Sequence, residues 1–155
     1  MNYSQITDSL FIGTTPLPDD YATLRDLEVD LVINMRVERR PHPDRHASPM
    51  AVLWLPTFDS PLVPIPLHML RRGVRAALQT IKENGKVYVH CAGGRHRGVA
   101  MGAAILIAQG HSAQEAMALI KQRRNQADPE AWYIKRQIRR FASTWDHHEN
   151  TGNNL

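Results

Sequence analysis

His90-Cys91-Ala92-Gly93-Gly94-Arg95-His96-Arg97 is the stretch of sequence that decides the fold. It contains the only cysteine of the 155 residues, and five residues, two of them glycine, separate this cysteine from Arg97. A strand-like segment, residues 86–90, leads into the stretch, and a helix-like segment, residues 97–109, follows it. A strand, a glycine loop and a helix start direct backbone N–H groups and the helix dipole toward one spot. The stretch therefore predicts an anion-binding loop.

Cys91 and Arg97 are the two residues of this loop that carry chemistry. Arg97 offers a planar fork of donors that matches the oxygens of a phosphate group. Neighbouring cations and a helix N-terminus favour the thiolate form of cysteine, which is the nucleophile. A thiolate beneath a bound phosphate is placed to attack phosphorus. Cysteine is also common as a buried structural residue, but a position between a strand end and a glycine loop argues against that role for Cys91.

The run His90-Cys91-x5-Arg97 resembles the signature loop of the cysteine-dependent protein-tyrosine and dual-specificity phosphatases. The lead-in at residues 86–90 and two upstream stretches, residues 6–13 and 29–36, resemble strands of that family, in the family's order. The resemblance spans about residues 5–145. It implies a nucleophile at Cys91, a phosphate clamp at Arg97 and a phosphate-binding loop that comprises His90, Ala92, Gly93, Gly94, Arg95, His96 and Gly98. His90 would order this loop through hydrogen bonds.

Asp59 is the acid that the resemblance implies. The family places an aspartate in a proline-bearing loop upstream of the cysteine, and Asp59 lies in the segment Pro56–Pro61. Cleavage of a phosphate monoester leaves an oxygen anion that a carboxylic acid must protonate. A turn aspartate is the ordinary alternative, because Ser60 and Pro61 follow directly.

Gly98 departs from the family pattern. The family usually has serine or threonine directly after the arginine, and that hydroxyl eases the departure of the thiolate when phosphocysteine is hydrolysed. Two alternatives to an efficient phosphatase therefore stay open: a phosphate-binding module with poor turnover, and a rhodanese-type sulfur or arsenate enzyme. Enzymes of the latter fold carry glycine after the arginine, but they have no need of an acid such as Asp59.

The composition predicts one globular domain with a core of useful size, since 43% of the residues are hydrophobic and 22% are charged. The single cysteine excludes an internal disulfide and suits a reducing cytoplasm. No apolar run reaches the roughly 18 residues of a membrane helix, so we expect no stable membrane anchor. The net charge of +4 favours anionic partners, but no nucleic-acid motif is present. We expect a monomer that needs no cofactor. No metal is expected either, because the spacing of the candidate ligands is not that of a metal site; these are His42, His46, His147 and His148.

The order of elements predicts a single α/β domain, with a central, mostly parallel sheet flanked by helices, over residues 1–146. A polar, disordered tail is expected over residues 147–155. Expected strands cover residues 11–13, 29–35, 51–55 and 86–90. Expected helices cover residues 20–27, 66–84, 97–109 and 112–124, and a last helix begins at Asp128 and Pro129.

The sequence does not decide between several classes of phosphorylated substrate. The resemblance implies phosphotyrosine, with phosphoserine, phosphothreonine or a phosphoinositide as further substrates, carried by a protein or a small phosphate ester. Arg95 and His96 would favour multiply charged substrates, unless they are only variable residues of the rim. Glu38 could hold Arg97 from behind, although a solvated loop glutamate is commoner. The last helix has a basic face that could bind a membrane but is more often only solvated; it comprises Lys135, Arg136, Arg139 and Arg140. Trp132 and Trp145 are expected in the core.

Overall fold

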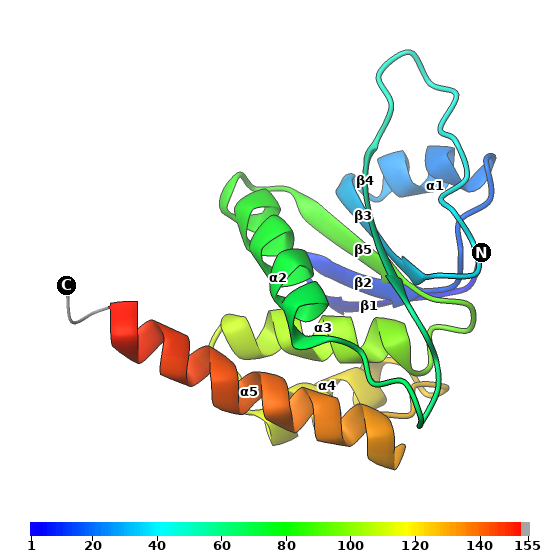
Figure 1. The fold of residues 1–155 in the computed structure, drawn as a ribbon. Helices are drawn as coiled ribbons and strands as arrows, with labels where there is room; N and C mark the ends of the chain where they lie inside the picture. The colour runs from blue at the N-terminus through cyan, green and yellow to red at the C-terminus, as the bar shows by residue number, and fades with distance from the viewer. Residues whose placement is uncertain (153–155) are drawn as a thin grey trace.

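Five strands form one twisted sheet at the centre of the molecule (Figure 1). The structure, a computed structural model, describes the backbone of residues 1–152 and the side chains of residues 1–145. The strands are β1 (Tyr3–Thr7), β2 (Leu10–Gly13), β3 (Val29–Arg36), β4 (Ala51–Thr57) and β5 (Lys86–His90). Their order across the sheet is β1-β2-β5-β3-β4. Only β1 is antiparallel to its neighbour, so the predicted, mostly parallel sheet is confirmed.

Helices cover both faces of this sheet unequally. The helices are α1 (Asp20–Asp26), α2 (Leu67–Lys82), α3 (Arg97–Ala108), α4 (Ala113–Arg123) and α5 (Trp132–Gly152). Figure 1 shows α1 on one face and the other four helices gathered on the opposite face. Strand side chains alternate between the two faces. Val87 and Val89 accordingly face the large core under α2–α5, whereas Tyr88 faces a smaller core with Tyr21 and Leu24 of α1.

Helix α3 lies at the centre of the larger layer, in contact with α2, α4, α5 and the sheet. Every residue from Val99 to Ile107 is buried. A helix that is apolar on all sides must be enclosed by other elements. The surrounding helices and the sheet enclose α3 in this way. No helix in the described part of the chain is long and apolar enough to span a bilayer.

Three details differ from the sequence-based expectations. Residues 6–13 are not one opening strand but parts of a hairpin, in which β1 pairs with β2 across Asp8 and Ser9. The last helix begins at Trp132 instead of at Pro129, because the backbone N–H of Asp128 donates to the carbonyl of Arg95 at 3.0 Å and holds this segment in a turn. Trp132 is 61% exposed and therefore not a core residue.

Other expectations for the last two helices are confirmed. Helix α4 lies within the expected range of residues 112–124, and Ser112 and Glu115 form a capping box at its start. Trp145 packs against the larger core and stacks on Phe141, with ring centroids 5.5 Å apart. Helix α5 includes part of the segment 147–155, where we expected a disordered tail. Residues 153–155 lie outside the described residues, and the expectation for the tail stays a prediction.

Candidate active site

The predicted strand, glycine loop and helix lie together at the carboxyl end of β5. Strand β5 ends at His90, Cys91 follows with 3% of its surface exposed, and α3 begins at Arg97. Because β5 lies between the parallel strands β2 and β3, this end of the sheet is where ligands bind in open α/β folds. A hollow of about 180 Å³ opens there, and it is lined by Asp59, Cys91, Ala92, Gly93, Arg95, His96 and Arg97. The structure thus brings all three candidate catalytic residues to one place.

The loop has the backbone of an anion cradle. No side chain caps the N-terminus of α3, and no acidic residue lies in its first turn, so the first N–H groups of the helix are free of side-chain acceptors. Gly94 has a φ of +62°, and a Cβ there would lie 2.8 Å from the carbonyl oxygen of Gly13. Both the dihedral angle and the close approach require glycine at this position.

Arg124 supports this loop from behind, and sequence reasoning missed it. Its side chain is only 1% exposed. Its Nε donates to the carbonyl of Gly94 at 2.8 Å, and one Nη donates to that of Gly93 at 3.1 Å. These bonds hold the two carbonyl oxygens on the Arg124 side of the loop. In the sequence, Arg124 ends an amphipathic helix beside exposed cations, and nothing local distinguishes it from them.

Arg97 is buried, with 4% of its surface exposed, and Glu38 holds its guanidinium in a bidentate pair at 2.8 and 2.9 Å. The carbonyl of Thr57 accepts a further hydrogen bond at 2.8 Å. The Nε of Arg97 is a buried donor that has no partner among the described residues. Because an unpaired buried donor is costly, this N–H is suited to an anion in the hollow.

Glu38 is therefore a partner of Arg97 and not merely a solvated loop residue. Its loop is held by Asn34, whose amide nitrogen donates to the carbonyl of Arg39 at 3.1 Å and whose amide oxygen accepts from the N–H of Arg36 at 2.8 Å. The hydrogen bond from Arg97 outweighs partial burial and lowers the pKa of Glu38 to about 2. Glu38 is thus ionised at neutral pH.

His90 is buried beside the thiol, with 2% of its surface exposed. Its Nδ1 lies 3.3 Å from the carbonyl oxygen of Cys91. Burial lowers the pKa of His90 to about 4, so the imidazole is neutral at physiological pH. The hydroxyl of Thr15 donates to the same carbonyl at 3.1 Å. These contacts order the backbone at Cys91.

Asp59 belongs to a hydrogen-bonded cluster at the mouth of the hollow. The Tyr133 hydroxyl donates to its Oδ1 at 2.6 Å, and the Nδ1 of His96 lies 3.0 Å from its Oδ2. The other ring nitrogen of His96 lies 3.4 Å from a carboxylate oxygen of Asp128. Burial acts to raise the pKa of Asp59, but the hydrogen bonds from Tyr133 and His96 outweigh it, and the pKa lies below its usual value. Tyr133 and Asp128 were not predicted as neighbours of the acid.

No cluster of three or more His, Cys, Asp or Glu side chains that could hold a metal ion occurs among the described residues. The hollow contains instead a thiol, a guanidinium, backbone N–H groups and a carboxyl group. These groups can bind a tetrahedral oxyanion, attack its central atom and exchange a proton with an ester oxygen.

A model of the dual specificity phosphatase catalytic domain matches residues 10–143 of this chain. The chain belongs to this family. It is thus a phosphatase of the cysteine-dependent class, as the signature loop implied, and the match favours that interpretation over the rhodanese-type alternative. The matched residues include the loop, Asp59, Arg124 and Tyr133, so one domain of this dual-specificity phosphatase carries the whole site.

Relatives of this phosphatase share both sequence and fold. Mouse dual specificity phosphatase 28 is 28% identical over 128 residues, which are 82% of this chain and 76% of the relative. The crystal structure of human DUSP28 superposes with a TM-score of 0.80 at 23% sequence identity. The match covers 93% of this chain and 95% of the DUSP28 chain. The structure of PTPMT1 in complex with PI(5)P has a TM-score of 0.81 at 25% identity, over 95% of this chain and 98% of that one.

Proposed function

We propose that this phosphatase hydrolyses phosphate monoesters through a phosphocysteine intermediate, with Cys91 as nucleophile, Arg97 as phosphate clamp and Asp59 as acid and base. The observation that carries the proposal is that these three side chains line one hollow of about 180 Å³. The uncapped start of α3 adds its dipole at the same place. The phosphate-binding loop around Cys91 and Arg97 comprises His90, Ala92, Gly93, Gly94, Arg95, His96 and Gly98.

The first half-reaction transfers the phosphoryl group to sulfur. The loop N–H groups and the Nε of Arg97 bind the phosphate oxygens, and the Cys91 thiolate forms an S–P bond while the ester P–O bond breaks. The leaving oxygen takes a proton from Asp59. An arriving phosphate dianion raises the pKa of a nearby carboxyl group, since like charges disfavour ionisation. Substrate therefore promotes protonation of Asp59, which is ionised in the free enzyme.

The second half-reaction releases inorganic phosphate. Asp59, now a carboxylate, accepts a proton from a water molecule, whose oxygen forms a bond to phosphorus while the S–P bond breaks. The electron pair of that bond returns to sulfur as the thiolate. Tyr133 and His96 hold the Asp59 carboxylate through both steps and are positioning residues.

The site is shallow and open, which suits several classes of phosphate ester. Asp59 and Arg95 are exposed at the rim, and His96 is half-buried. We expect phosphotyrosine as a substrate, together with the shorter phosphoserine, phosphothreonine and phosphoinositide esters, because Arg95 and Asp59 at the rim are exposed. The free thiol suits a reducing, cytoplasmic compartment. A monomeric state stays a prediction.

Hydrolysis of an aryl phosphate by the Cys91→Ser variant tests the proposal. The variant is expected to lose nearly all turnover, because a serine hydroxyl is a far weaker nucleophile at neutral pH. Tungstate, a phosphate analogue, should still bind it, since the loop and Arg97 are unchanged. Retained turnover would contradict the assignment of Cys91, and wild-type protein that binds tungstate without hydrolysis would be a binding module instead.

A further inference from the structure

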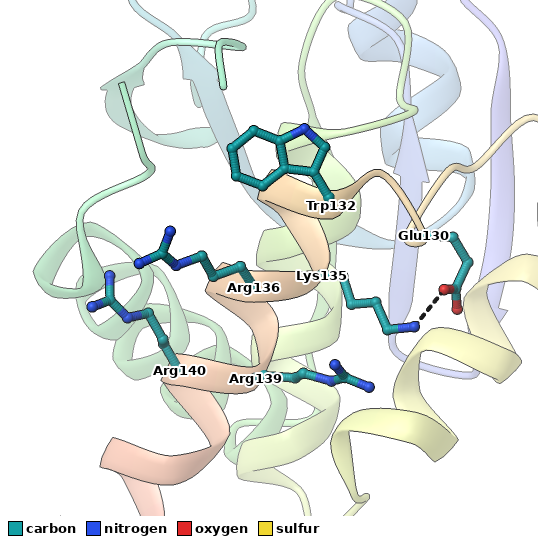
Figure 2. A pocket seen from close by; sticks show the side chains of 6 residues that line it. All are labelled: Glu130, Trp132, Lys135, Arg136, Arg139 and Arg140. Carbon is teal, nitrogen blue, oxygen red and sulfur yellow. Dashed lines mark hydrogen bonds and ion pairs between the residues drawn. The ribbon is translucent and has the colours of Figure 1, made fainter. Parts of the chain in front are cut away.

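A cationic face covers the exposed side of helix α5. It surrounds a recess of about 530 Å³, and Figure 2 shows the side chains that line it. We call four of these residues the basic face: Lys135, Arg136, Arg139 and Arg140. They recur with helical spacing on the side of α5 opposite to Ile134, Ile138 and Phe141, which are buried in the core.

Most of this charge is not neutralised by the fold. Lys135 pairs with Glu130 at 2.6 Å, as the dashed line in Figure 2 marks. Arg136, Arg139 and Arg140 are exposed, and none of them forms an ion pair within the described residues. Like charges three and four residues apart on a helix destabilise it. Folding therefore gains nothing from this cluster, and an external anion would relieve its repulsion.

Exposed apolar side chains gather beside the basic face. Six large hydrophobic residues are exposed in the described part of the chain. Three of them lie in the segment between β4 and α2, and a fourth is the first residue of α5. We call these four the apolar rim: Phe58, Leu62, Val63 and Trp132. Leu62 is 90% exposed and Trp132 is 61% exposed. An apolar group that the fold leaves in water marks an interaction site when several occur together.

Two hydrogen bonds join these features into one surface. Tyr133 donates to Asp59 at 2.6 Å, and the side-chain amide of Gln137 donates to the carbonyl of Ile65 at 2.6 Å. They hold the β4–α2 segment against the first two turns of α5, as Figure 1 shows. Because Asp59 also lines the hollow that contains Cys91, the apolar rim and the basic face lie beside the mouth of the active site.

We propose that this surface docks on the face of an anionic phospholipid bilayer. The guanidinium groups of the basic face bind the headgroup phosphates, and the apolar rim inserts between the headgroups. Exposed Trp, Phe and Leu beside clustered Arg and Lys are the combination by which peripheral proteins bind membrane interfaces. An acidic protein would match the charge, but it offers no layer into which separate side chains such as Leu62 and Trp132 can insert.

Docking in this orientation brings the mouth of the hollow to the bilayer surface. Phosphate monoesters presented by lipids or by membrane-bound proteins then lie within reach of Cys91; this consequence rests on the proposed function. The docking itself does not, because it uses no residue of the catalytic loop. The basic face of α5 and the exposed Trp132 thus receive a common role, where the sequence alone favoured a solvated helix face and a core tryptophan.

Co-sedimentation with vesicles tests the docking directly. The full chain is mixed with vesicles of phosphatidylcholine, either pure or containing phosphatidylglycerol, at low and at physiological ionic strength. We expect binding to the anionic vesicles only, weakened by salt because screening shortens the range of exposed charges. The double variant Arg139→Gln/Arg140→Gln should bind roughly 25-fold more weakly, since each cation near the membrane contributes about fivefold.

A matched variant controls for the loss of charge. Lys82→Gln/Lys86→Gln removes two cations at the end of the sheet opposite to the active site, and it should bind vesicles like the wild-type protein. Equal losses in the two double variants would mean that only net charge matters and would overturn the proposal. Binding of polyglutamate with the same dependence on Arg139 and Arg140, without binding of vesicles, would assign the surface to an acidic protein instead.

Insertion of the apolar rim has its own readout. Brominated lipid should quench the fluorescence of vesicle-bound wild-type protein, and Trp132→Phe should lose most of this quenching while still binding. Leu62→Ser should weaken vesicle binding about tenfold, in line with the cost of exposing one aliphatic side chain. Quenching that persists in Trp132→Phe would show that this rim does not insert.

Failure of the docking and failure of the proposed function are distinguishable. The Arg139→Gln/Arg140→Gln variant and Leu62→Ser should hydrolyse a small aryl phosphate at the wild-type rate, because none of these side chains lines the hollow. Hydrolysis without vesicle binding would overturn only the docking. Vesicle binding without hydrolysis would overturn only the phosphatase mechanism.

Discussion

A side chain at Gly98 would lie beside the sulfur of Cys91. A Cβ at Gly98 would lie 3.6 Å from Cys91 Sγ and 3.5 Å from its backbone nitrogen, which are ordinary contact distances. Gly98 is not among the residues with positive φ, so the backbone accepts an L side chain. A serine at this position would therefore bring a hydroxyl next to the thiolate, and the natural chain lacks it.

We predict that breakdown of phosphocysteine is the slow step for this reason. A hydrogen bond to a charged group contributes about 1.5–3 kcal/mol, so its absence slows the second half-reaction by roughly ten- to a hundredfold. Rapid mixing with an aryl phosphate should show a burst of phenol close to one equivalent of enzyme. The variant Gly98→Ser should raise steady turnover and diminish the burst.

The variant Gly98→Ala is the matched control, since it adds the Cβ without the hydroxyl. It should keep the burst and the slow turnover of the natural protein. An equal gain from alanine and serine, or no burst in the natural protein, would show that another group already assists the departing thiolate.

Replacement of Asp59 should act according to the leaving group. Asp59→Asn is expected to slow the cleavage of phenyl phosphates with basic leaving groups about 10²–10⁴-fold and to affect nitrophenyl phosphates much less. A series of substituted phenyl phosphates measures this dependence. Asp128→Asn, which touches His96 but does not line the hollow, should show a flat, small effect across the series. A flat response for Asp59→Asn would exclude it as the acid.

Tyr133 should set the pH range in which Asp59 is protonated. The hydrogen bond from Tyr133 lowers the pKa of Asp59, and burial, together with the same bond, raises the pKa of Tyr133 to about 12. Tyr133→Phe removes the bond, so the pKa of Asp59 rises and the basic limb of the kcat/KM profile moves to higher pH. The pH–rate profile for a poor leaving group checks this shift. An unchanged limb with reduced activity would leave Tyr133 a purely structural role.

Removal of Arg124 should loosen the phosphate loop. Arg124→Met leaves the carbonyls of Gly93 and Gly94 without their donors, and an unsatisfied buried carbonyl costs about 1–3 kcal/mol. We expect a lower free energy of unfolding and a weaker affinity for tungstate. Arg123→Met changes the exposed neighbour on the same helix and should alter neither. Equal stability and affinity in the two variants would show that the contacts of Arg124 contribute little.

The ion pair of Glu38 with Arg97 predicts a pH-dependent stability. The pKa of Glu38 falls to about 2 in the folded protein, from an ordinary value near 4.3. Its contribution is therefore complete above about pH 5 and disappears as the pH falls toward 2. Thermal unfolding of the wild type and of Glu38→Gln should differ at pH 6 and converge at low pH. A constant difference would contradict the pairing.

The local pattern of the sequence was sufficient for the centre of the site. Residues 86–90 form a strand and residues 97–108 a helix because a short apolar run, two loop glycines and a longer apolar run leave few other ways to bury these side chains. The mostly parallel sheet and the position of the loop at a carboxyl strand end follow from the alternation of strands and helices. Asp59 was found through the spacing that a family resemblance supplies, and the structure places it in the hollow.

Only the tertiary structure decided how these groups are supported. Glu38 meets Arg97 across 59 positions of the chain, Arg124 reaches Gly94 across 30, and Tyr133 reaches Asp59 across 74. An arginine after a helix or a glutamate in a loop has the same local pattern whether water or a buried partner satisfies it. The expectation of a core position for Trp132 was wrong for the same reason: the packing of α5 against α3 decides which of its side chains are buried, and it leaves Trp132 and the basic face in solvent. Sequence determined which groups act on phosphate; the arrangement of the elements decided what holds them and what surface surrounds them.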